Sequence, residues 1–269
     1  MSLNTQKVIP SLLERYELKY VIPVEMIGPI SEFASVYCSP DNYSSKTASG
    51  FYRVNSLYLD SPSYLFLKMR LEGVQNRINM RVRSYGDNPE LPYFLEIKQK
   101  TGGVVRKYRA QVTDKDWYRA YTEPGFNGKN GKDGSENNLN RKRFERLVFT
   151  YNAEPKILTQ YLRKALISDV DDYARITFDT NLKYRAETSY VPVPGERDMT
   201  SSDHSLAFDP GCSVILELKC YTSRVPLWMI DLIRYFNLQR QSFSKYMLGA
   251  SELMGLYRYD SDSRVSAVI

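Results

Sequence analysis

The sequence predicts an α+β fold in which about eight antiparallel strands form a barrel or a sandwich with helices packed on the outside. Two observations predict it. Many short segments alternate between polar and apolar residues, which is the pattern of antiparallel strands that bury one face. Apolar stretches with helical spacing lie between and after these segments. Such helices could cover the apolar faces of the sheet.

Five strands and two helices are predicted in the first part of the chain. Pro23 and Glu25 suit the first turn of a helix that follows the first strand. Gly73 is placed to end the second helix, and Gly102-Gly103 would turn the last two strands into a hairpin. The predicted strands are 13–22, 51–60, 76–86, 92–100 and 104–113, and the predicted helices are 24–36 and 63–73.

The second part of the chain is predicted to hold two loops between further strands and helices. Residues 122–138 and 194–206 are polar, and we expect flexible loops there. Apolar residues recur at helical spacing over 155–167, which favours a helix. The remaining predictions are strand, turn, strand over 173–187, a strand at 213–222, and helices at 226–236 and 244–257.

Length and composition indicate one domain and exclude several classes of chemistry. We expect a single domain over 1–269 with its core at about 13–257, because no linker divides the 269 residues. No apolar run could span a bilayer, and the first ten residues lack the apolar centre of a signal peptide. Cys38, Cys212 and Cys220 lack zinc-site spacing, so we interpret them as free thiols of a cytoplasmic protein.

The net charge of +6 permits an anionic partner without choosing between nucleic acid, a membrane surface and free phosphates. The single histidine, His204, lies in a polar segment. This argues against histidine-based acid–base chemistry, a catalytic triad and a histidine-rich metal site. Any metal should therefore be a hard cation held by carboxylates.

Six predicted strands carry charged residues on one face and apolar residues on the other. A polar face in water is common in antiparallel sheets, but here arginine and lysine dominate that face. Like charges on neighbouring strands are destabilising, and a bound polyanion would offset that repulsion. The charged faces include Glu17 and Lys19, Arg81 and Arg83, Glu96 and Lys98, Lys107 and Arg109, Arg175 and Asp179, and Glu217 and Lys219.

These residue types point to phosphate chemistry. One arginine can bind two phosphate oxygens in a bidentate manner, and lysine acts as a point charge. A glutamate among the cations can hold Mg²⁺ or Mn²⁺ together with phosphate oxygens. Phosphoryl transfer depends mainly on positioning and charge neutralisation and needs no protein nucleophile.

The ordered set of strand motifs resembles a known family. RYELKY, SLYLDSP, MRVRSYG, FLEIKQK, RKYR, RITFD, LELK and FSKY, taken in this order, resemble the VTC-type polyphosphate polymerase domain of the triphosphate tunnel metalloenzymes, which include the CYTH-type proteins. The resemblance covers about 13–257. It implies an eight-stranded antiparallel β-barrel, a triphosphate tunnel, with helices outside. It also implies a metal-dependent transferase that moves the γ-phosphate of ATP to a growing polyphosphate chain.

The resemblance implies a role for individual residues. Glu217 would hold Mn²⁺ or Mg²⁺, with Glu17 and Glu96 as weaker candidates, and Tyr173 would stack on the nucleotide base. The residues expected to contact phosphate are Lys19, Arg81, Arg83, Lys98, Lys107, Arg109, Arg175, Arg185, Lys219, Ser244 and Lys245.

Two positions depart from the family pattern. Arg15 replaces the first glutamate of the wider superfamily's first strand, which favours the polymerase branch over two-metal triphosphatases. Ser242 stands where the polymerases have a lysine, and Arg240 is a candidate substitute. A hydrolase of nucleoside triphosphate or tripolyphosphate and a non-catalytic polyphosphate-binding module therefore stay open as alternatives.

The expected partners follow from the same resemblance. They are ATP or another nucleoside triphosphate and inorganic polyphosphate. Nucleic acid is not expected, because the basic faces should point inward. We expect no direct membrane insertion, although a membrane-protein partner is compatible with the family. The chain resembles a stand-alone bacterial form of the domain.

Overall fold

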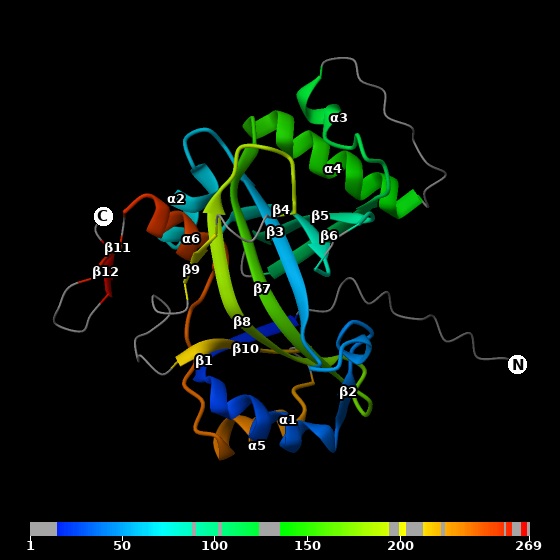
Figure 1. Ribbon diagram of the computed structural model, residues 1–269, viewed down its shortest axis with the longest axis vertical. Coiled ribbons are helices and arrows are strands. Elements are labelled where there is room, and N and C mark those ends of the chain that lie inside the picture. The colour runs from blue at the N-terminus through cyan, green and yellow to red at the C-terminus, as the bar shows by residue number, and fades with distance from the viewer. Residues whose placement is uncertain are drawn as a thin grey trace, which may run out of the picture.

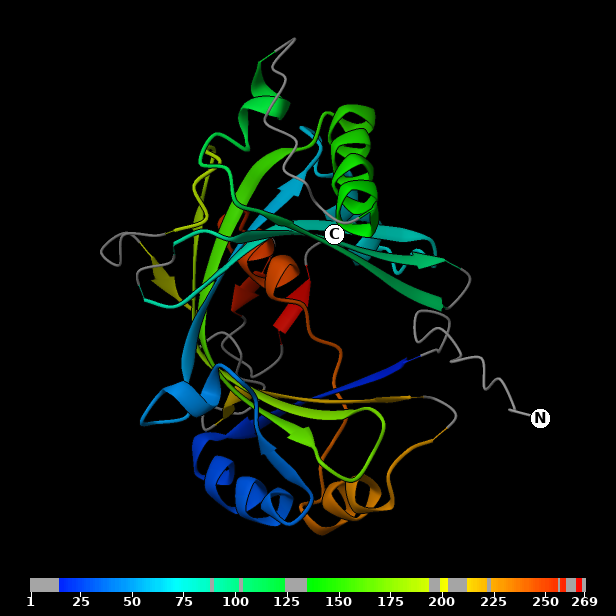
Figure 2. The same ribbon diagram turned by 90° about the vertical axis from the view of Figure 1, so that its right-hand side faces the viewer.

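One large antiparallel sheet dominates this computed structural model and curls into a half-barrel (Figures 1 and 2). The structure describes residues 15–87, 90–101, 104–123, 135–193, 199–202, 212–221, 224–255, 257–259 and 265–267. The predicted fold class is confirmed. Eight strands follow one another across the sheet in the order β1 (Arg15–Pro23), β10 (Cys212–Tyr221), β8 (Ala174–Ala186), β7 (Glu154–Ser168), β3 (Tyr52–Asp60), β4 (Arg77–Tyr85), β5 (Tyr93–Thr101) and β6 (Val104–Val112).

Short elements complete the described part of the chain. β2 (Cys38–Pro40) pairs with β7, and β9 (Thr200–Ser201) pairs with β8. β11 (Tyr257–Tyr259) and β12 (Val265–Ala267) form a separate two-stranded sheet. The single turns of 3₁₀ helix are η2 (Val24–Met26) and η3 (Ser44–Lys46).

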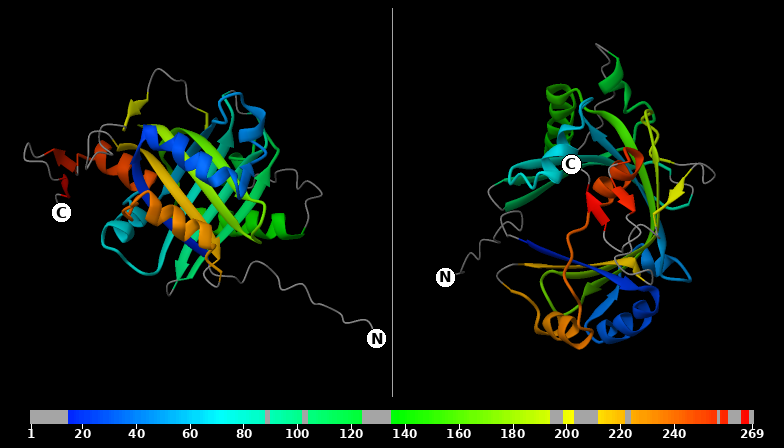
Figure 3. Two further views of the ribbon diagram at one scale, coloured as in Figure 1. Left: turned by 90° about the horizontal axis from the view of Figure 1, so that it is seen from below. Right: turned by 90° about the vertical axis from the view of Figure 1, so that its left-hand side faces the viewer.

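Helices cover the convex face of the sheet at both ends (Figures 1 and 3). α1 (Ile27–Ser35) and α5 (Leu227–Tyr235) pack on β1, β10 and β8 around Phe178, Leu216 and Trp228. α4 (Ser135–Tyr151), next to the short α3 (Arg119–Thr122), packs on β4, β5 and β6 around Val82, Leu95 and Phe144. The apolar faces of the predicted strands thus form two cores on the outside of the half-barrel.

Two helices close part of the concave side. α6 (Lys245–Leu253) lies inside the curl of the sheet and packs through Tyr246 and Ala250 against Tyr58 and Tyr184, next to α2 (Leu65–Leu71) (Figure 2). A Cβ at Gly249 would meet Tyr184 Cβ at 3.2 Å and the ring atom Cγ at 3.3 Å, so the helix and the strand approach closely. The concave face is therefore apolar beneath α6, and its charged residues lie beyond that helix.

The helix predicted over 155–167 is wrong, because these residues form β7. Ile157 and Tyr161 face the concave side, while Leu158 and Leu166 belong to the convex cores. A strand buried on both faces has apolar residues on both sides and loses the simple alternation that marks a half-buried strand. The resulting apolar pattern imitates helical spacing.

The turn predicted within 173–187 is also wrong. β8 is continuous, and Asn181 adopts a left-handed conformation with φ of 56°. The register with β7 shifts at this point, from Gln160 opposite Lys183 to Leu162 opposite Thr180. This is a β-bulge, in which an extra residue sits in one strand of a pair. Asparagine is among the few residues that tolerate such a φ, in a turn or in a bulge alike.

Both outer edges of the sheet are covered, the β1 edge by the segment before α6 and the β6 edge by side chains of α4. β1 bonds along its free edge to the segment before α6, through a bridge between Tyr20 and Arg240 and a bond from Gln241 N to Lys19 O of 2.8 Å. At the edge of β6, the Asn137 and Asn140 side chains of α4 bond the backbone of Gln111 and Arg109. Covered edges resist pairing with another strand.

The other predicted elements agree with the structure within a few residues, apart from the last helix and the loops. The helix predicted over 244–257 ends at Leu253, and Gly255 follows with φ of 63°. Within the two predicted loops, 135–138 begin α4 and Thr200–Ser201 form β9. Residues 124–134, 194–198 and 203–206, including His204, and the Gly102-Gly103 turn lie outside the described residues.

Two further expectations concern the cysteines and the possibility of a membrane-spanning helix. Cys38 and Cys220 are free and buried. Across the ranges that the structure describes, every helix is too short or too polar to cross a membrane.

Candidate functional site

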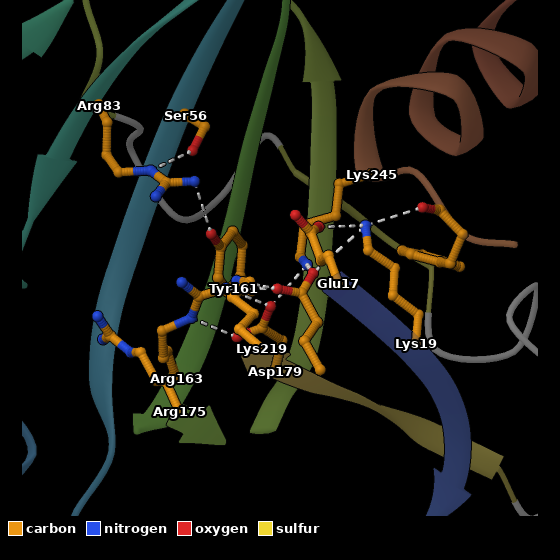
Figure 4. Close-up of polar contacts among 12 residues, drawn as sticks. Glu17, Lys19, Ser56, Arg83, Tyr161, Arg163, Arg175, Asp179, Lys219 and Lys245 are labelled. Atoms are coloured by element: carbon orange, nitrogen blue, oxygen red, sulfur yellow. Dashed lines mark hydrogen bonds and ion pairs between the residues drawn. The ribbon is translucent and has the colours of Figure 1, made fainter. Parts of the chain in front are cut away.

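Strands β1 and β10 place two glutamates and two lysines in crossed pairs on the concave face. In the register of these strands, Glu17 lies opposite Lys219 and Lys19 lies opposite Glu217. Lys19 Nζ lies 3.2 Å from Glu17 and 3.4 Å from Glu217, and Lys219 Nζ lies 2.5 Å from Glu217 (Figure 4). Opposite charges at such cross-strand positions stabilise the pairing of the two strands.

Glu217 is the centre of this group, which we call the Glu217 cluster: Glu17, Lys19, Arg163, Asp179, Glu217, Lys219 and Lys245. Burial alone would raise the pKa of Glu217, but Lys219, Lys19, Lys245 and Arg163 hold this pKa well below its usual range. The carboxylate therefore stays ionised although its side chain is only 6% exposed.

Arg163 and Lys245 enclose a second buried carboxylate of the cluster. Arg163 donates two hydrogen bonds to Asp179, of 2.6 and 2.7 Å, and Lys245 Nζ lies 2.6 Å from the same carboxylate. Lys245 also lies 3.9 Å from Glu217. It is the first residue of α6, and Ser244 caps this helix by accepting a bond from Met247 N. The start of α6 is thereby tied to β8 and β10.

Glu96 on β5 is the centre of a second group, the Glu96 cluster, with Arg81, Arg83, Lys107 and Arg109. Glu96 lies 2.7 Å from Arg81, 2.8 Å from Lys107, and 3.7 and 3.6 Å from Arg83 and Arg109. Its side chain is 1% exposed, and burial would raise its pKa. The cations, Arg83 foremost, instead hold the pKa of Glu96 well below its usual range. Burial lowers the pKa of Lys107 to about 7, with Arg81 and Arg83 assisting and Glu96 opposing.

Tyr161 and one ion pair connect the two clusters. Arg83 donates to the Tyr161 hydroxyl at 3.2 Å, and the ammonium of Lys245 lies 4.6 Å from the centre of the Tyr161 ring (Figure 4). Lys98 on β5 reaches Glu17 on β1 at 2.7 Å. The two clusters therefore line one continuous, mainly basic surface inside the half-barrel.

Arg175 and Tyr173 lie at one end of this surface. Arg175 is opposite Lys219 in the sheet and bonds Asp41 at 2.6 Å. Tyr173 packs on Tyr221, with ring centres 5.0 Å apart. Both tyrosines line a pocket of about 160 Å³ together with Val170, Asp171, Asp172 and Arg224. The structure thus places Tyr173 next to a small open pocket beside the basic surface.

The structure does not bring Arg185 or Arg240 to this surface. Arg185 follows the β8 bulge, lies opposite Leu158 of the convex core and bonds Glu187 at 2.7 Å. Arg240 is exposed and shares a face with Tyr20, which is part of the other convex core. Arg240 therefore does not take the place of the lysine that the resemblance expects at Ser242.

Sequence reasoning missed three cationic or aromatic residues of the surface. Arg163 and Tyr161 were hidden by the wrong helix prediction, although their period-two spacing with Thr159 was a signal for one face of a strand. Arg70 of α2 donates weakly, at 3.5 Å, to the Phe243 carbonyl that also accepts a bond from Lys19. Its Nε is buried without a hydrogen-bond partner among the described residues. Asp179 was on a predicted charged face but had no assigned role.

The donor atoms suit a metal that is bound together with phosphate. Among the described residues, no group of three or more His, Cys, Asp or Glu side chains is arranged so that it could hold a metal ion by itself. Glu17 and Glu217 are nevertheless close enough for Lys19 to contact both. Mg²⁺ is commonly held by one or two carboxylates plus substrate phosphates, so this pair fits. Glu96 fits less well, because the cations around it contact no second carboxylate among the described residues.

Solved structures with a similar course of the chain share little sequence with it. A candidate adenylate cyclase from Bacillus halodurans aligns over 86% of this chain and 94% of its own, with a TM-score of 0.48 and 10% identity. A candidate adenylyl cyclase from Hippeastrum, described as having a dominant triphosphatase activity, aligns over 89% of this chain and 96% of its own, with a TM-score of 0.44 and 14% identity. Likenesses this distant carry no functional conclusion.

Similarity in sequence is more specific. Vacuolar transporter chaperone complex subunit 4 from Trypanosoma cruzi (strain CL Brener) is 25% identical over 229 residues, and that from Trypanosoma brucei brucei is 25% identical over 230 residues. Each alignment covers 75% of this chain and 28% of the relative's length. The VTC domain family matches residues 14–254, which is most of the chain. The chain therefore belongs to the VTC domain family.

Proposed function

We propose that this protein is a metal-dependent polyphosphate polymerase that transfers the γ-phosphate of ATP to a growing polyphosphate chain. One observation carries the proposal: Glu217 stays ionised among four cations and faces a second cation-rich cluster across the same half-barrel. The excess of arginine and lysine supplies charge for a polyanion, while the glutamate supplies a metal ligand. Membership of the VTC domain family supports the same substrate class.

The cations would exchange their carboxylate partners for phosphate oxygens. Lys98, Lys107 and Arg109 keep 45, 46 and 41% of their side chains exposed, so a ligand can reach them. Arg81, Arg83, Lys19, Lys219 and Lys245 are more buried and would meet phosphates deeper inside. Arg70, whose Nε has no hydrogen-bond partner in the part of the chain that the structure describes, is a further candidate contact. Ser244 would add free N–H groups at the start of α6.

The nucleotide would enter at the end marked by Tyr173. Its base would pack in the pocket that Tyr173 and Tyr221 line together. Arg175 follows Tyr173 by two residues and lies opposite Lys219, so the triphosphate would run from the pocket past these two cations to Glu217. On this path the γ-phosphate would lie between the two clusters.

Glu217, assisted by Glu17, would hold Mn²⁺ or Mg²⁺ against the phosphates. When bound, the metal would neutralise charge on the phosphate oxygens. The terminal oxygen of the polyphosphate chain would attack the γ-phosphorus, and the bond from that phosphorus to the leaving ADP oxygen would break. The arginines and lysines would hold donor and acceptor in line, so that no protein nucleophile is needed.

A non-catalytic polyphosphate-binding module is the second candidate. It is favoured by the serine at position 242, because Arg240 lies on the opposite side of the sheet and does not replace the lysine that the family pattern has there. Binding would survive this loss more easily than catalysis, since binding depends on many charges and catalysis on the placement of a few.

A product assay and a measurement of polyphosphate binding together distinguish the candidates. The protein is incubated with ATP and Mn²⁺ or Mg²⁺, and polyphosphate, ADP and free phosphate are measured, with Glu217→Ala as the test variant. Glu25→Ala, an exposed glutamate in η2, is the matched control. Long chains that disappear only in Glu217→Ala support the polymerase. Phosphate release without chains would indicate a hydrolase, and polyphosphate binding without either product would indicate the module. A cytoplasmic location, a stand-alone chain and a membrane-protein partner remain predictions.

A further inference from the structure

Two sequence motifs contain residues for which the proposed chemistry has no use. SLYLDSP contributes Tyr58 and Asp60, and FSKY contributes Tyr246. In the structure these residues meet. The Tyr246 hydroxyl donates to Asp60 Oδ2 at 2.5 Å, and the Tyr246 ring stacks on Tyr58 with ring centres 5.1 Å apart. Contacts between segments 186 residues apart therefore join the end of β3 to the first turn of α6.

Asp60 is a fixed acceptor. It is fully buried and accepts bonds from the backbone N–H groups of Ser61, Phe66 and Leu67 at 2.7, 2.8 and 2.9 Å. Phe66 and Leu67 belong to the first turn of α2, whose free N–H groups favour a carboxylate. Three backbone bonds hold this carboxylate in one orientation, so it can position whatever else it binds.

Tyr246 is the residue after Lys245, and the first turn of α6 carries both. Lys245 is 8% exposed and extends to Asp179 at 2.6 Å. Farther along α6, the helix is positioned by close packing of Gly249 on Tyr184, and the Tyr184 hydroxyl bonds Glu252. The bond between Tyr246 and Asp60 is thus the anchor next to Lys245, and the Tyr184 contacts form a second anchor farther from the charged surface.

We propose that Asp60 and Tyr246 are positioning residues that hold the first turn of α6 so that Lys245 reaches the Glu217 cluster. Tyr58 extends the same network, because its hydroxyl accepts a bond from Arg81 at 3.3 Å. The residues of the SLYLDSP and FSKY motifs therefore link the start of α6 to both charged clusters. The consequence for phosphate binding rests on the proposed function, whereas the effect on Lys245 does not.

The first test measures the reactivity of Lys245 directly. Reductive methylation followed by mass spectrometry reports how accessible each lysine is. Tyr246→Phe removes one hydroxyl, and Tyr184→Phe is the matched control that removes a buried hydroxyl from the other anchor. We expect Tyr246→Phe to raise the labelling rate of Lys245 on the order of tenfold, the effect of losing a hydrogen bond to a charged group. Lys219, on β10, should keep its rate in both variants.

Two results would overturn the proposal. One is an unchanged Lys245 rate in Tyr246→Phe. The other is an equal rise at Lys245 and Lys219, which would mean that the hydroxyl supports general stability only. Unfolding of the variant would produce this second result.

The second test connects positioning to ligand binding, with inorganic tripolyphosphate as the probe in calorimetry. Tyr246→Phe should bind the probe about tenfold more weakly than the parent protein and Tyr184→Phe. In a Lys245→Ala background, Tyr246→Phe should have no further effect, since coupled residues are not additive. If the effects of the two substitutions on the binding free energy were fully additive, Tyr246 would not act through Lys245, and the proposal would be refuted. If the parent protein does not bind tripolyphosphate, the proposed function fails, and the methylation result still decides the positioning role.

Discussion

Lys98 and Glu17 form an ion pair of 2.7 Å between β5 and β1, two strands that are not neighbours in the sheet. The sheet path begins at β1 and ends at β6, next to β5. This ion pair therefore spans the open side of the half-barrel, and both side chains keep contact with solvent, at 45 and 27% exposure. An anion that displaces Glu17 from Lys98 would open a path into the charged surface.

The exposure of this pair predicts a difference between stability and binding. Lys98→Ala should change the free energy of unfolding by less than about 1 kcal/mol, because exposed ion pairs contribute little. It should nevertheless weaken tripolyphosphate binding by several-fold, and the loss should shrink as salt is added. Melting curves and calorimetry at two salt concentrations check this. Arg119→Ala, which breaks an exposed pair with Glu123, is the control, and an equal loss of binding there would contradict the prediction.

Lys107 predicts a pH dependence of ligand binding. Because its pKa is about 7, the ammonium is charged at pH 6 and largely neutral at pH 8. Binding should therefore weaken as pH rises, by about threefold, since solvent moderates the effect on a half-exposed side chain. Lys107→Arg keeps its charge across this range, so the ratio of its affinity to that of the parent protein isolates the effect. A ratio that does not vary with pH would refute the prediction.

Glu96 predicts a large loss of stability on neutralisation. Glu96→Gln would remove the counter-ion of Arg83, which is buried, and of Arg81, which is partly buried. Removing one partner of a buried ion pair typically costs about 3–5 kcal/mol, and we expect a loss of this order. Denaturant unfolding measures it. Glu123→Gln, which removes an exposed partner of Arg119, should leave the midpoint unchanged.

The buried carboxylates predict the acid limit of the fold. The pKa values of Glu96, Asp179 and Glu217 lie below their usual ranges because of nearby cations, in spite of burial. Their stabilisation is complete above the unfolded-state values of about 4, and it is lost as pH falls below them, since the unfolded chain binds protons first. The unfolding midpoint should therefore be constant from pH 7 to about 5 and fall steeply towards pH 3. A midpoint that is constant down to pH 3 would contradict the proposed charge state.

Most of the charged surface could be predicted from alternation within single strands. Glu17 with Lys19 and Glu217 with Lys219 share a face in any straight strand, so their common side follows from sequence alone. Their crossed pairing depends on the register between β1 and β10, which two separate strands do not specify. Arg185 shows the limit of the method, because counting by twos from Arg175 fails wherever a bulge intervenes.

The position of α6 was beyond sequence reasoning for a different reason. Tyr246 and Ala250 indicate a helix with one apolar side, but either face of a curled sheet can accept such a side. The decisive details are the bare Cα of Gly249 against Tyr184 and the bond from Tyr246 to Asp60. These are contacts between distant segments, whereas the sequence pattern reports only on neighbours along the chain.

Asn181 is an extra residue in β8, and it changes which residues of the strand face the concave side. Before Asn181, the odd-numbered residues Arg175 and Asp179 join the charged concave surface. After it, the even-numbered residues Leu182 and Tyr184 lie on that side and pack against α6. One strand thus serves two purposes: its first half forms ion pairs, and its second half is a docking site for a helix. Deletion of Asn181 would remove only the bulge and keep Leu182 and Tyr184 on the side of α6. If Asn181 were instead retained as a regularly paired residue, Arg185 would turn inward and Tyr184 outward, and α6 would lose its packing partner on β8.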